Sequence, residues 1–300
     1  MFKNIIGNAN VKNILEKEIK NDCILHSYLF SGQEGIGKLL IAKEFAKAVL
    51  CENKNDKPCG KCKSCIQYES GNHSDFNIIE PDGNTIKIDQ IRYMNSKIVE
   101  KPVISYRKIY IINESEKMTV DAQNCLLKTL EEPPEYATII LICSQENSLL
   151  TTIKSRCTKI EFQNLNNQEI KMYFDLKGEN IEDSIINLAE GSISKALKRM
   201  PKQETYIKLK RLIENIENID KLDMIKQEFI YQEKDEIQDL LEVVNNIIFQ
   251  IAKEKNQYLN CISIVEDTKR NLKSNGNFDM CIDNLLFSIW EEVNEKHSRS

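Results

Sequence analysis

The chain has 300 residues, of which 41% are hydrophobic and 29% charged, a composition typical of globular proteins, and its length predicts about two or three domains. No apolar run approaches the roughly 18 residues that a membrane span requires, and residues 1–7 lack the apolar segment of a secretory signal, so a membrane protein is excluded and a cytoplasmic location is expected. The 41 basic and 46 acidic residues give a net charge of −5, which excludes a general nucleic-acid coat protein, because contact with nucleic acid would need a local basic patch.

Short apolar runs alternate with helical patterns over the first half of the chain, which is typical of a parallel sheet wrapped by helices. The runs that we predict to be strands are Tyr28–Phe30, Lys108–Ile112, Thr138–Cys143 and Lys159–Phe162. Residues 168–200 combine helical stretches with a break at Gly191, which predicts a small helical subdomain. After Pro201 the only glycine or proline is Gly276, and apolar residues recur at intervals of three and four. Three to five amphipathic helices are therefore expected in this last part.

A glycine-rich loop follows the first predicted strand and leads into the helical run 39–50. Its candidate phosphate-binding residues are Gly32, Gly35, Gly37 and Lys38. Glycines let backbone amides turn toward phosphate oxygens, and a lysine at this place reaches the outer phosphates, so the order of strand, loop and helix is typical of a nucleotide-binding P-loop. A glycine turn that only joins strand to helix is the alternative.

Two positions depart from a working nucleotide site. Leu39 stands where the pattern requires a Ser or Thr hydroxyl as a ligand to Mg²⁺, and the strand 108–112 is followed by Asn113 where an aspartate is expected. Glu114 comes next and remains a candidate site residue. These departures leave open whether the loop hydrolyses nucleotide, only holds it, or has become structural.

Four of the ten cysteines are closely spaced in the sequence. They are Cys51, Cys59, Cys62 and Cys65. Four thiolates at this spacing can complete a tetrahedral zinc site, and since all four ligands come from protein, the metal is expected to be structural. Reduced thiols or a redox pair are the alternatives. The other six cysteines are predicted to pack as small apolar residues.

These motifs resemble the clamp-loader ATPases of the AAA+ class and, within it, the delta-prime family of bacterial DNA polymerase III. The segments that carry the resemblance are His26–Gly32, the cysteine cluster, Ser70–Asp75, Leu126–Pro134 and Ser155–Cys157. The resemblance implies an α/β AAA+ P-loop domain at 1–165 with a parallel sheet and a zinc module inserted at 51–65. It further implies a small helical lid at 166–203 and an all-α collar domain at 204–300.

The resemblance also implies roles for single residues. Arg156 would act as an arginine finger that reaches the nucleotide of a neighbouring subunit, although a surface arginine ending a helix is the alternative. Ser144 would serve as a first sensor near the terminal phosphate, or it simply caps a strand. Ser194 stands where working motors have a sensor arginine, which is a third departure from the hydrolytic apparatus.

The function implied is that of a clamp-loader subunit of the DNA polymerase III holoenzyme, a nucleotidyltransferase complex. Such a subunit joins motor and clamp-opening subunits in a hetero-oligomeric ring and helps to load the sliding clamp on primed DNA. The three departures predict a chain that hydrolyses little ATP and binds it weakly or not at all. The alternatives are an ATP-hydrolysing motor subunit of the gamma or tau type and, less favoured by the net charge, a zinc-dependent nucleic-acid-binding module. Lys128 is a further candidate for contact with DNA, although a solvated surface charge is the favoured interpretation.

Overall fold

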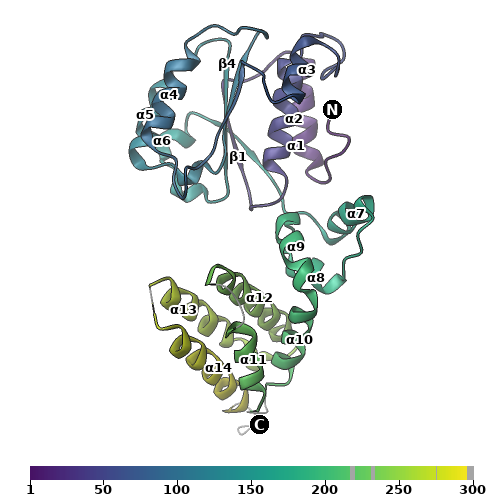
Figure 1. Ribbon diagram of the computed structural model, residues 1–300, viewed down its shortest axis with the longest axis vertical. Helices are drawn as coiled ribbons and strands as arrows, with labels where there is room; N and C mark the ends of the chain where they lie inside the picture. The colour runs from purple at the N-terminus through teal and green to yellow at the C-terminus, as the bar shows by residue number, and fades with distance from the viewer. Residues whose placement is uncertain (217–219, 231–233, 275, 296–300) are drawn as a thin grey trace. The chain divides into compact units, whose positions relative to one another are not determined.

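The chain forms two compact units in a computed structural model that describes residues 1–216, 220–230, 234–274 and 276–295 (Figure 1). The first unit comprises Met1–Asn180 and Glu190–Ser194, and the second comprises Ile181–Ala189 and the described residues from Lys195 onward. The predicted lid segment 166–203 contributes to both units. The domain boundaries expected after residues 165 and 203 remain predictions.

A five-stranded parallel sheet forms the centre of the first unit, in the order β2-β3-β4-β1-β5. The strands are β1 (Ser27–Ser31), β2 (Phe76–Ile79), β3 (Lys108–Ile112), β4 (Ala137–Cys143) and β5 (Thr158–Glu161). The four predicted strands are confirmed with shifts of at most one residue at each end. Strand β2 was not predicted, because it has only four residues and a polar asparagine interrupts its apolar run.

Alternate residues of the central strands enter two separate hydrophobic cores. In β1, Tyr28 and Phe30 face one core, while Leu29 faces the other. In β4, Ile140 joins the first core and Leu141 the second. Since strand side chains point alternately to opposite faces, strands covered on both faces need apolar residues at nearly every position, which β1, β3 and β4 provide, whereas the edge strand β5 buries only Ile160.

Helices cover both faces of this sheet. They are α1 (Ala9–Lys20), α2 (Lys38–Leu50), α3 (Lys63–Glu69), α4 (Ile88–Ile98), α5 (Val120–Glu131) and α6 (Thr151–Lys154). The first three lie on one face and the last three on the other (Figure 1). Helix α7 (Asn167–Lys177) also belongs to the first unit. The first unit is therefore a three-layered α/β domain.

The second unit is helical in its described residues. Its helices are α8 (Asp183–Leu188), most of α9 (Ile193–Arg199), α10 (Gln203–Glu214), α11 (Asp220–Ile230), α12 (Lys234–Ala252), α13 (Cys261–Lys273) and α14 (Phe278–Glu295). From α10 onward these helices confirm the prediction of three to five after Pro201. Buried residues at helical spacing, such as Leu241, Val244 and Ile248 of α12, supply the core.

The isolated cysteines follow the prediction only in part. Cys143 and Cys261 are buried and three others are half-buried, but Cys23 is exposed. The prediction is wrong for Cys23, because this residue follows the last turn of α1 and its thiol turns back to the Asn21 carbonyl instead of entering the core.

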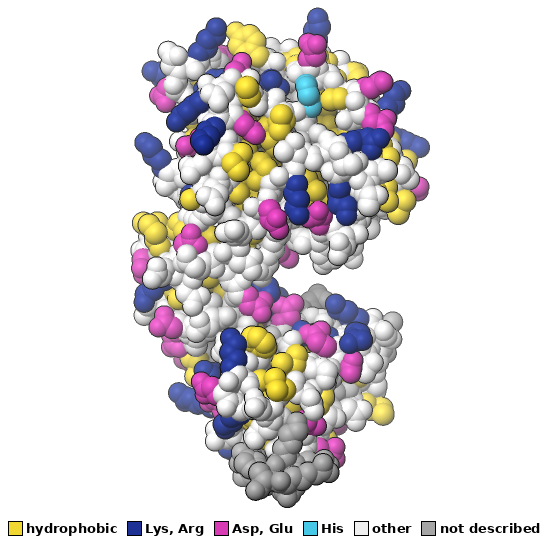
Figure 2. Space-filling view, turned by 180° about the vertical axis from the view of Figure 1, so that it is seen from behind, with side chains coloured by type: hydrophobic (Ala, Val, Ile, Leu, Met, Phe, Trp, Pro, Cys, Tyr) yellow, Lys and Arg dark blue, Asp and Glu magenta, His cyan; other side chains and the backbone are white. Residues whose placement is uncertain are grey.

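The surface carries both signs of charge. Figure 2 shows Lys and Arg side chains interspersed with Asp and Glu over both units, in line with the small net charge. Among the described residues no helix has both the length and the apolar character needed to cross a bilayer.

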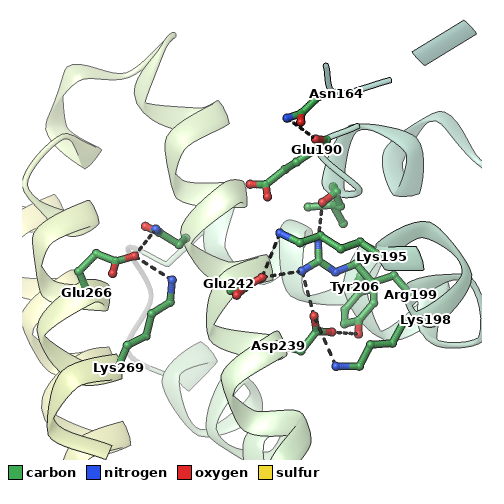
Figure 3. A network of polar contacts seen from close by, with 12 residues as sticks. Asn164, Glu190, Lys195, Lys198, Arg199, Tyr206, Asp239, Glu242, Glu266 and Lys269 are labelled. Carbon is green, nitrogen blue, oxygen red and sulfur yellow. Dashed lines mark hydrogen bonds and ion pairs between the residues drawn. The ribbon is translucent and has the colours of Figure 1, made fainter. Parts of the chain in front are cut away.

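One buried guanidinium contacts several polar groups of the second unit (Figure 3). The Arg199 side chain is only 1% exposed and donates to the Leu188 carbonyl of α8. Its Nη2 lies 3.0 Å from an Asp239 oxygen and 3.3 Å from a Glu242 oxygen of α12. Tyr206 of α10 donates to the second Asp239 oxygen at 3.4 Å. A single residue thus joins helices α8, α9 and α12.

We predict that Arg199→Ala destabilises the second unit by about 3 kcal/mol, because it leaves Asp239 largely buried without its main cation. Lys198→Ala is the matched control, since Lys198 is 56% exposed and lies 3.8 Å from the same carboxylate, so its loss should cost under about 1 kcal/mol. Urea unfolding followed by the fluorescence of Trp290, the only tryptophan, measures both. Equal destabilisation by the two variants would contradict the conclusion that Arg199 is the main cation of Asp239.

Candidate functional site

The glycine-rich loop connects β1 to α2 at the carboxyl edge of the sheet. Gly32, Gly35 and Gly37 all have positive φ angles, of 147°, 77° and 93°. Residues with a Cβ rarely adopt such φ angles, so the three glycines permit the turn. Helix α2 begins directly after Gly37, at Lys38. The predicted order of strand, loop and helix is confirmed.

The Lys38 ammonium is already bound by the chain itself. Its Nζ donates to the carbonyls of Gly32 at 2.5 Å and Gln33 at 2.6 Å, and to the Ser144 hydroxyl at 3.3 Å. The residue is only 6% exposed. Burial lowers the pKa of Lys38, and the nearby Glu116 carboxylate acts in the opposite direction. The cation that would hold phosphate therefore has internal acceptors.

The acidic side chain beside Lys38 and Ser144 is Glu116 and not Glu114. A Glu116 oxygen accepts the Ser144 amide at 3.1 Å, and its other oxygen is buried without a hydrogen-bond partner among the described residues. Glu114 forms an ion pair with Lys117. Both glutamates follow β3, but the 3₁₀ turn Ser115–Lys117 decides which of them faces the loop. The only sequence signal for Glu116 is that it is a second acidic residue, two positions after Glu114.

The segment after the predicted break packs directly on the loop. A Cβ at Gly35 would come within 2.3 Å of the Ser192 hydroxyl and 2.5 Å of the Ser194 Cβ. The Ile193 amide donates to the Gly35 carbonyl at 3.1 Å. Ser194, which stands where a sensor arginine would be expected, is therefore brought to the loop, but it offers a small neutral side chain.

Two positions at the predicted phosphate site carry other side chains than those that hold Mg²⁺ in phosphoryl transfer. Leu39 packs its side chain against the core of the first unit, so it supplies no oxygen for Mg²⁺. Asn113 donates its backbone amide to the Ile79 carbonyl at the end of β2, and its side-chain amide carries no charge to hold a divalent ion. Stabilisation of the charge in phosphoryl transfer depends on these groups.

The four clustered cysteines converge at the end of α2 and the start of α3. Cys51 caps the carboxyl end of α2, Cys62 caps the amino end of α3 and Cys65 lies in the first turn of α3. With Cys59, their four Sγ atoms lie within 4.8 Å of one another, and the Cys51 and Cys62 sulfurs are 3.9 Å apart. The sequence prediction that these four residues form one group is confirmed.

Backbone amides point at the sulfurs of this cluster. The amides of Cys59, Cys62 and Cys65 each donate to the Sγ of another cluster member at 3.4 Å. Donation from the backbone of Lys61 and of Cys62 lowers the pKa of the Cys59 thiol to about 6, whereas burial raises the pKa of Cys65 to about 12. Amide donors favour the thiolate form that a metal requires.

The geometry of the cluster fits a tetrahedral metal site. With metal–sulfur bonds of about 2.3 Å, sulfur atoms in such a site are roughly 3.8 Å apart, close to the separation of the Cys51 and Cys62 sulfurs. Four thiolates and no carboxylate favour a soft or borderline ion. The group can therefore hold a metal with no ligand position left open.

A buried polar network joins residues beside the cysteine cluster to the end of α2 and to residues 103–105. The Ser64 hydroxyl donates to the Leu50 carbonyl at 2.7 Å and lies 2.9 Å from His73 Nε2. The fully buried Asp75 carboxylate accepts the amides of Val103, Ile104 and Ser105, each at 2.8 Å. His73 and Asp75, which belong to the segment Ser70–Asp75, therefore have structural roles.

Arg156 lies at the surface, after helix α6 and before β5. Its backbone carbonyl accepts the Ser27 hydroxyl at 2.6 Å. Its guanidinium donates to the Thr152 carbonyl at 2.8 Å and forms an ion pair with Glu131 at 2.5 Å. The Arg156 side chain is 33% exposed.

Comparisons with known proteins point to one family. The family model described as DNA polymerase III, delta subunit, matches residues 7–166. DNA polymerase III subunit delta' of Bacillus subtilis is 40% identical over 161 residues, which cover 54% of this chain and 49% of that protein. Subunit tau of the same organism is 37% identical over 170 residues, which cover 56% of this chain and 30% of that protein. The chain thus spans half or less of the length of these curated relatives.

A solved structure has the same fold over nearly the whole chain. It is that of a DNA polymerase III gamma subunit-related protein from Thermotoga maritima, with a TM-score of 0.51 and 22% identity. The match covers 94% of this chain and 99% of that one. The α/β sheet with its following helices is therefore a known architecture.

We predict that Gly35→Ala destabilises the first unit by about 2–4 kcal/mol. The substitution adds strain at a positive φ, about 1 kcal/mol, to a clash with Ser192 and Ser194. Gly71→Ala is the matched control, because Gly71 has a φ of 73° with no atom within 4 Å of an added Cβ. Hydrogen exchange of the β1 and β4 amides measures the difference. Equal losses would mean that residues 192–194 do not pack on the loop.

Proposed function

The chain belongs to the DNA polymerase III delta-subunit family, and we propose that it is a delta-prime-type clamp-loader subunit that helps to load the sliding clamp on primed DNA. The observation that carries this proposal is that the glycine-rich loop keeps its turn, with Gly32, Gly35 and Gly37 at positive φ, while Leu39, where a Mg²⁺ ligand is expected, packs against the core. Such a subunit contributes to an ATP-driven assembly without being an efficient ATPase. Identities of 40% and 38% to two delta' subunits support this reading.

The loop chemistry supports a chain that turns over little or no ATP. Lys38 is buried, and the negative charge of the nearby Glu116 carboxylate would disfavour nucleotide phosphates at this place. Leu39 and Asn113 leave Mg²⁺ without its usual protein ligands. In this proposal, Gly32, Gly35, Gly37, Lys38 and Ser144 form a degenerate phosphate site, and ATP binding is weak or absent.

Arg156 is proposed as the residue through which this chain takes part in catalysis. A guanidinium that approaches the terminal phosphate of a neighbouring subunit stabilises charge in the transition state and couples hydrolysis to assembly. The partial exposure of Arg156 supports this role. The neighbours would be motor subunits of the tau or gamma type and a clamp-opening subunit in a hetero-oligomeric ring, in the cytoplasm.

We propose that the chain has the three-part domain organisation of the clamp-loader AAA+ proteins that it resembles. Residues 1–165 would form the AAA+ domain with its metal module at 51–65, residues 166–203 the lid, and residues 204–300 the collar that joins subunits. The contacts of residues 192–194 with the glycine-rich loop support a lid role for this segment. The alternative is an ATP-hydrolysing motor subunit, which the 37% identity to a tau subunit favours and the loop chemistry disfavours.

The cysteine cluster is proposed to hold one structural zinc ion. Its Cys51, Cys59, Cys62 and Cys65 sulfurs would supply all four ligands, so no position remains for water or substrate. The ion would fix the loop 52–61 between α2 and α3, a stretch with little secondary structure of its own.

Replacing Arg156 by alanine should lower the ATPase kcat of a reconstituted complex with its motor subunits by about threefold or more, because one transition state loses its arginine finger. Arg92→Ala is the control, since Arg92 is another surface arginine of the first unit, paired with Asp89. The isolated wild-type chain should release no phosphate above background. Rapid turnover by the chain alone, or an unaffected Arg156→Ala complex, would refute the proposal.

Zinc content tests the metal assignment. Protein purified without added metal should contain about one zinc per chain, and Cys62→Ser should contain far less, because it removes one of four ligands. Cys23→Ser is the matched control, since Cys23 is exposed and outside the cluster. Elemental analysis measures the ratio. Little zinc in the wild type, or full zinc in Cys62→Ser, contradicts the assignment.

A further inference from the structure

Glu131 is the carboxylate that contacts Arg156. It is the last residue of α5, and its Oε1 lies 2.5 Å from Arg156 Nη2. The two residues are 25 positions apart in sequence and come from different elements. Their side chains are 48% and 33% exposed, so the pair lies at the surface where another molecule can reach it.

Helix stability does not explain a carboxylate at this position. The carboxyl end of a helix carries partial negative charge, which disfavours acidic side chains there. Helix α5 nevertheless ends in Glu131 and is followed by a second acidic residue, Glu132. Arg156 supplies the cation that offsets this cost for Glu131. The Glu131–Arg156 contact therefore holds the arginine as well as offsetting the charge at the helix end.

Arg156 is held from several sides at once. Its amide donates to the Ile153 carbonyl at 3.0 Å, and its own carbonyl accepts the Ser27 hydroxyl. The guanidinium is held by the Thr152 carbonyl through Nη1 and by Glu131 through Nη2. An unrestrained arginine would lose its rotamer freedom on meeting a ligand, and these contacts remove part of that freedom in advance.

The guanidinium still has donors to give. It carries five N–H groups, and the contacts to Thr152, Ser155 and Glu131 use at most three of them. Among the described residues, at least two N–H groups therefore remain for phosphate oxygens. Glu131 can keep its contact while the arginine binds an anion.

We propose that Glu131 is a positioning residue that presents the Arg156 guanidinium, in a fixed orientation, to a nucleotide phosphate on a neighbouring subunit. This inference rests on the proposed function, since it requires Arg156 to act in trans. Glu131 itself touches no reacting atom. Its effect is on orientation, to which transition-state contacts are sensitive.

The test compares three variants in a reconstituted complex with its motor subunits. Glu131→Gln keeps the size of the side chain but removes the ion pair, and it should lower the ATPase kcat about two- to fivefold with an unchanged KM for ATP. Glu132→Gln, an exposed neighbour at the end of the same helix, should match the wild type. Arg156→Ala should be slower than Glu131→Gln.

A second measurement needs no activity. In the isolated full chain, nitrogen-15 NMR should show slow rotation of the Arg156 guanidinium in the wild type and in Glu132→Gln, and faster rotation in Glu131→Gln. If Glu131 only stabilised the fold, replacing it would not change this rotation in a variant that still folds.

The outcomes separate the two proposals. A Glu131→Gln complex with wild-type or higher kcat, beside a slow Arg156→Ala complex, overturns the positioning role and leaves the finger intact. A guanidinium that rotates equally fast in wild type and Glu131→Gln also overturns it. An Arg156→Ala complex with wild-type kcat overturns the trans finger, and the role of Glu131 with it.

Discussion

The parallel register of the central sheet is the constraint on which the remaining features depend. Because all five strands run in one direction, the segments that follow them emerge at one edge. The glycine-rich loop after β1, Ser144 after β4 and Glu116 after β3 meet there, although up to about 110 residues separate them in sequence. Burial of alternate strand residues in two cores fixes this register, since a slip of one residue would exchange the two faces.

At this edge the groups of the glycine-rich loop find partners within the chain. Lys38 finds carbonyl oxygens within the loop, and Gly35 finds the small side chains of Ser192 and Ser194. A buried ammonium needs acceptors whether or not nucleotide is present, so internal acceptors keep the loop ordered. The same arrangement supports a proposed shift of function, from nucleotide turnover in this chain to the surface arginine at residue 156.

Contacts within the chain also hold the cysteine cluster and Arg156 in place, elsewhere in the first unit. Each group lies at the ends of secondary-structure elements, and each is held by contacts to neighbouring elements. Ser64 and His73 join the cluster to the end of α2, while Ser27 and Glu131 hold Arg156 between β1 and α5. The rigid α/β layers position groups that loops alone would leave variable.

The sequence by itself determined the strand runs, the glycine-rich loop, the cysteine group and the helical last part, because these depend on local periodicity, on positive φ angles that favour glycine and on spacing along the chain. It also indicated that Leu39 and Asn113 depart from a working site. Only the tertiary structure decided that Glu116 and not Glu114 faces Lys38, that residues 192–194 pack on Gly35 and that Glu131 contacts Arg156. The physical reason is that these contacts join residues from different elements, and which of two neighbouring glutamates turns inward depends on a single 3₁₀ turn and on packing that no local pattern records.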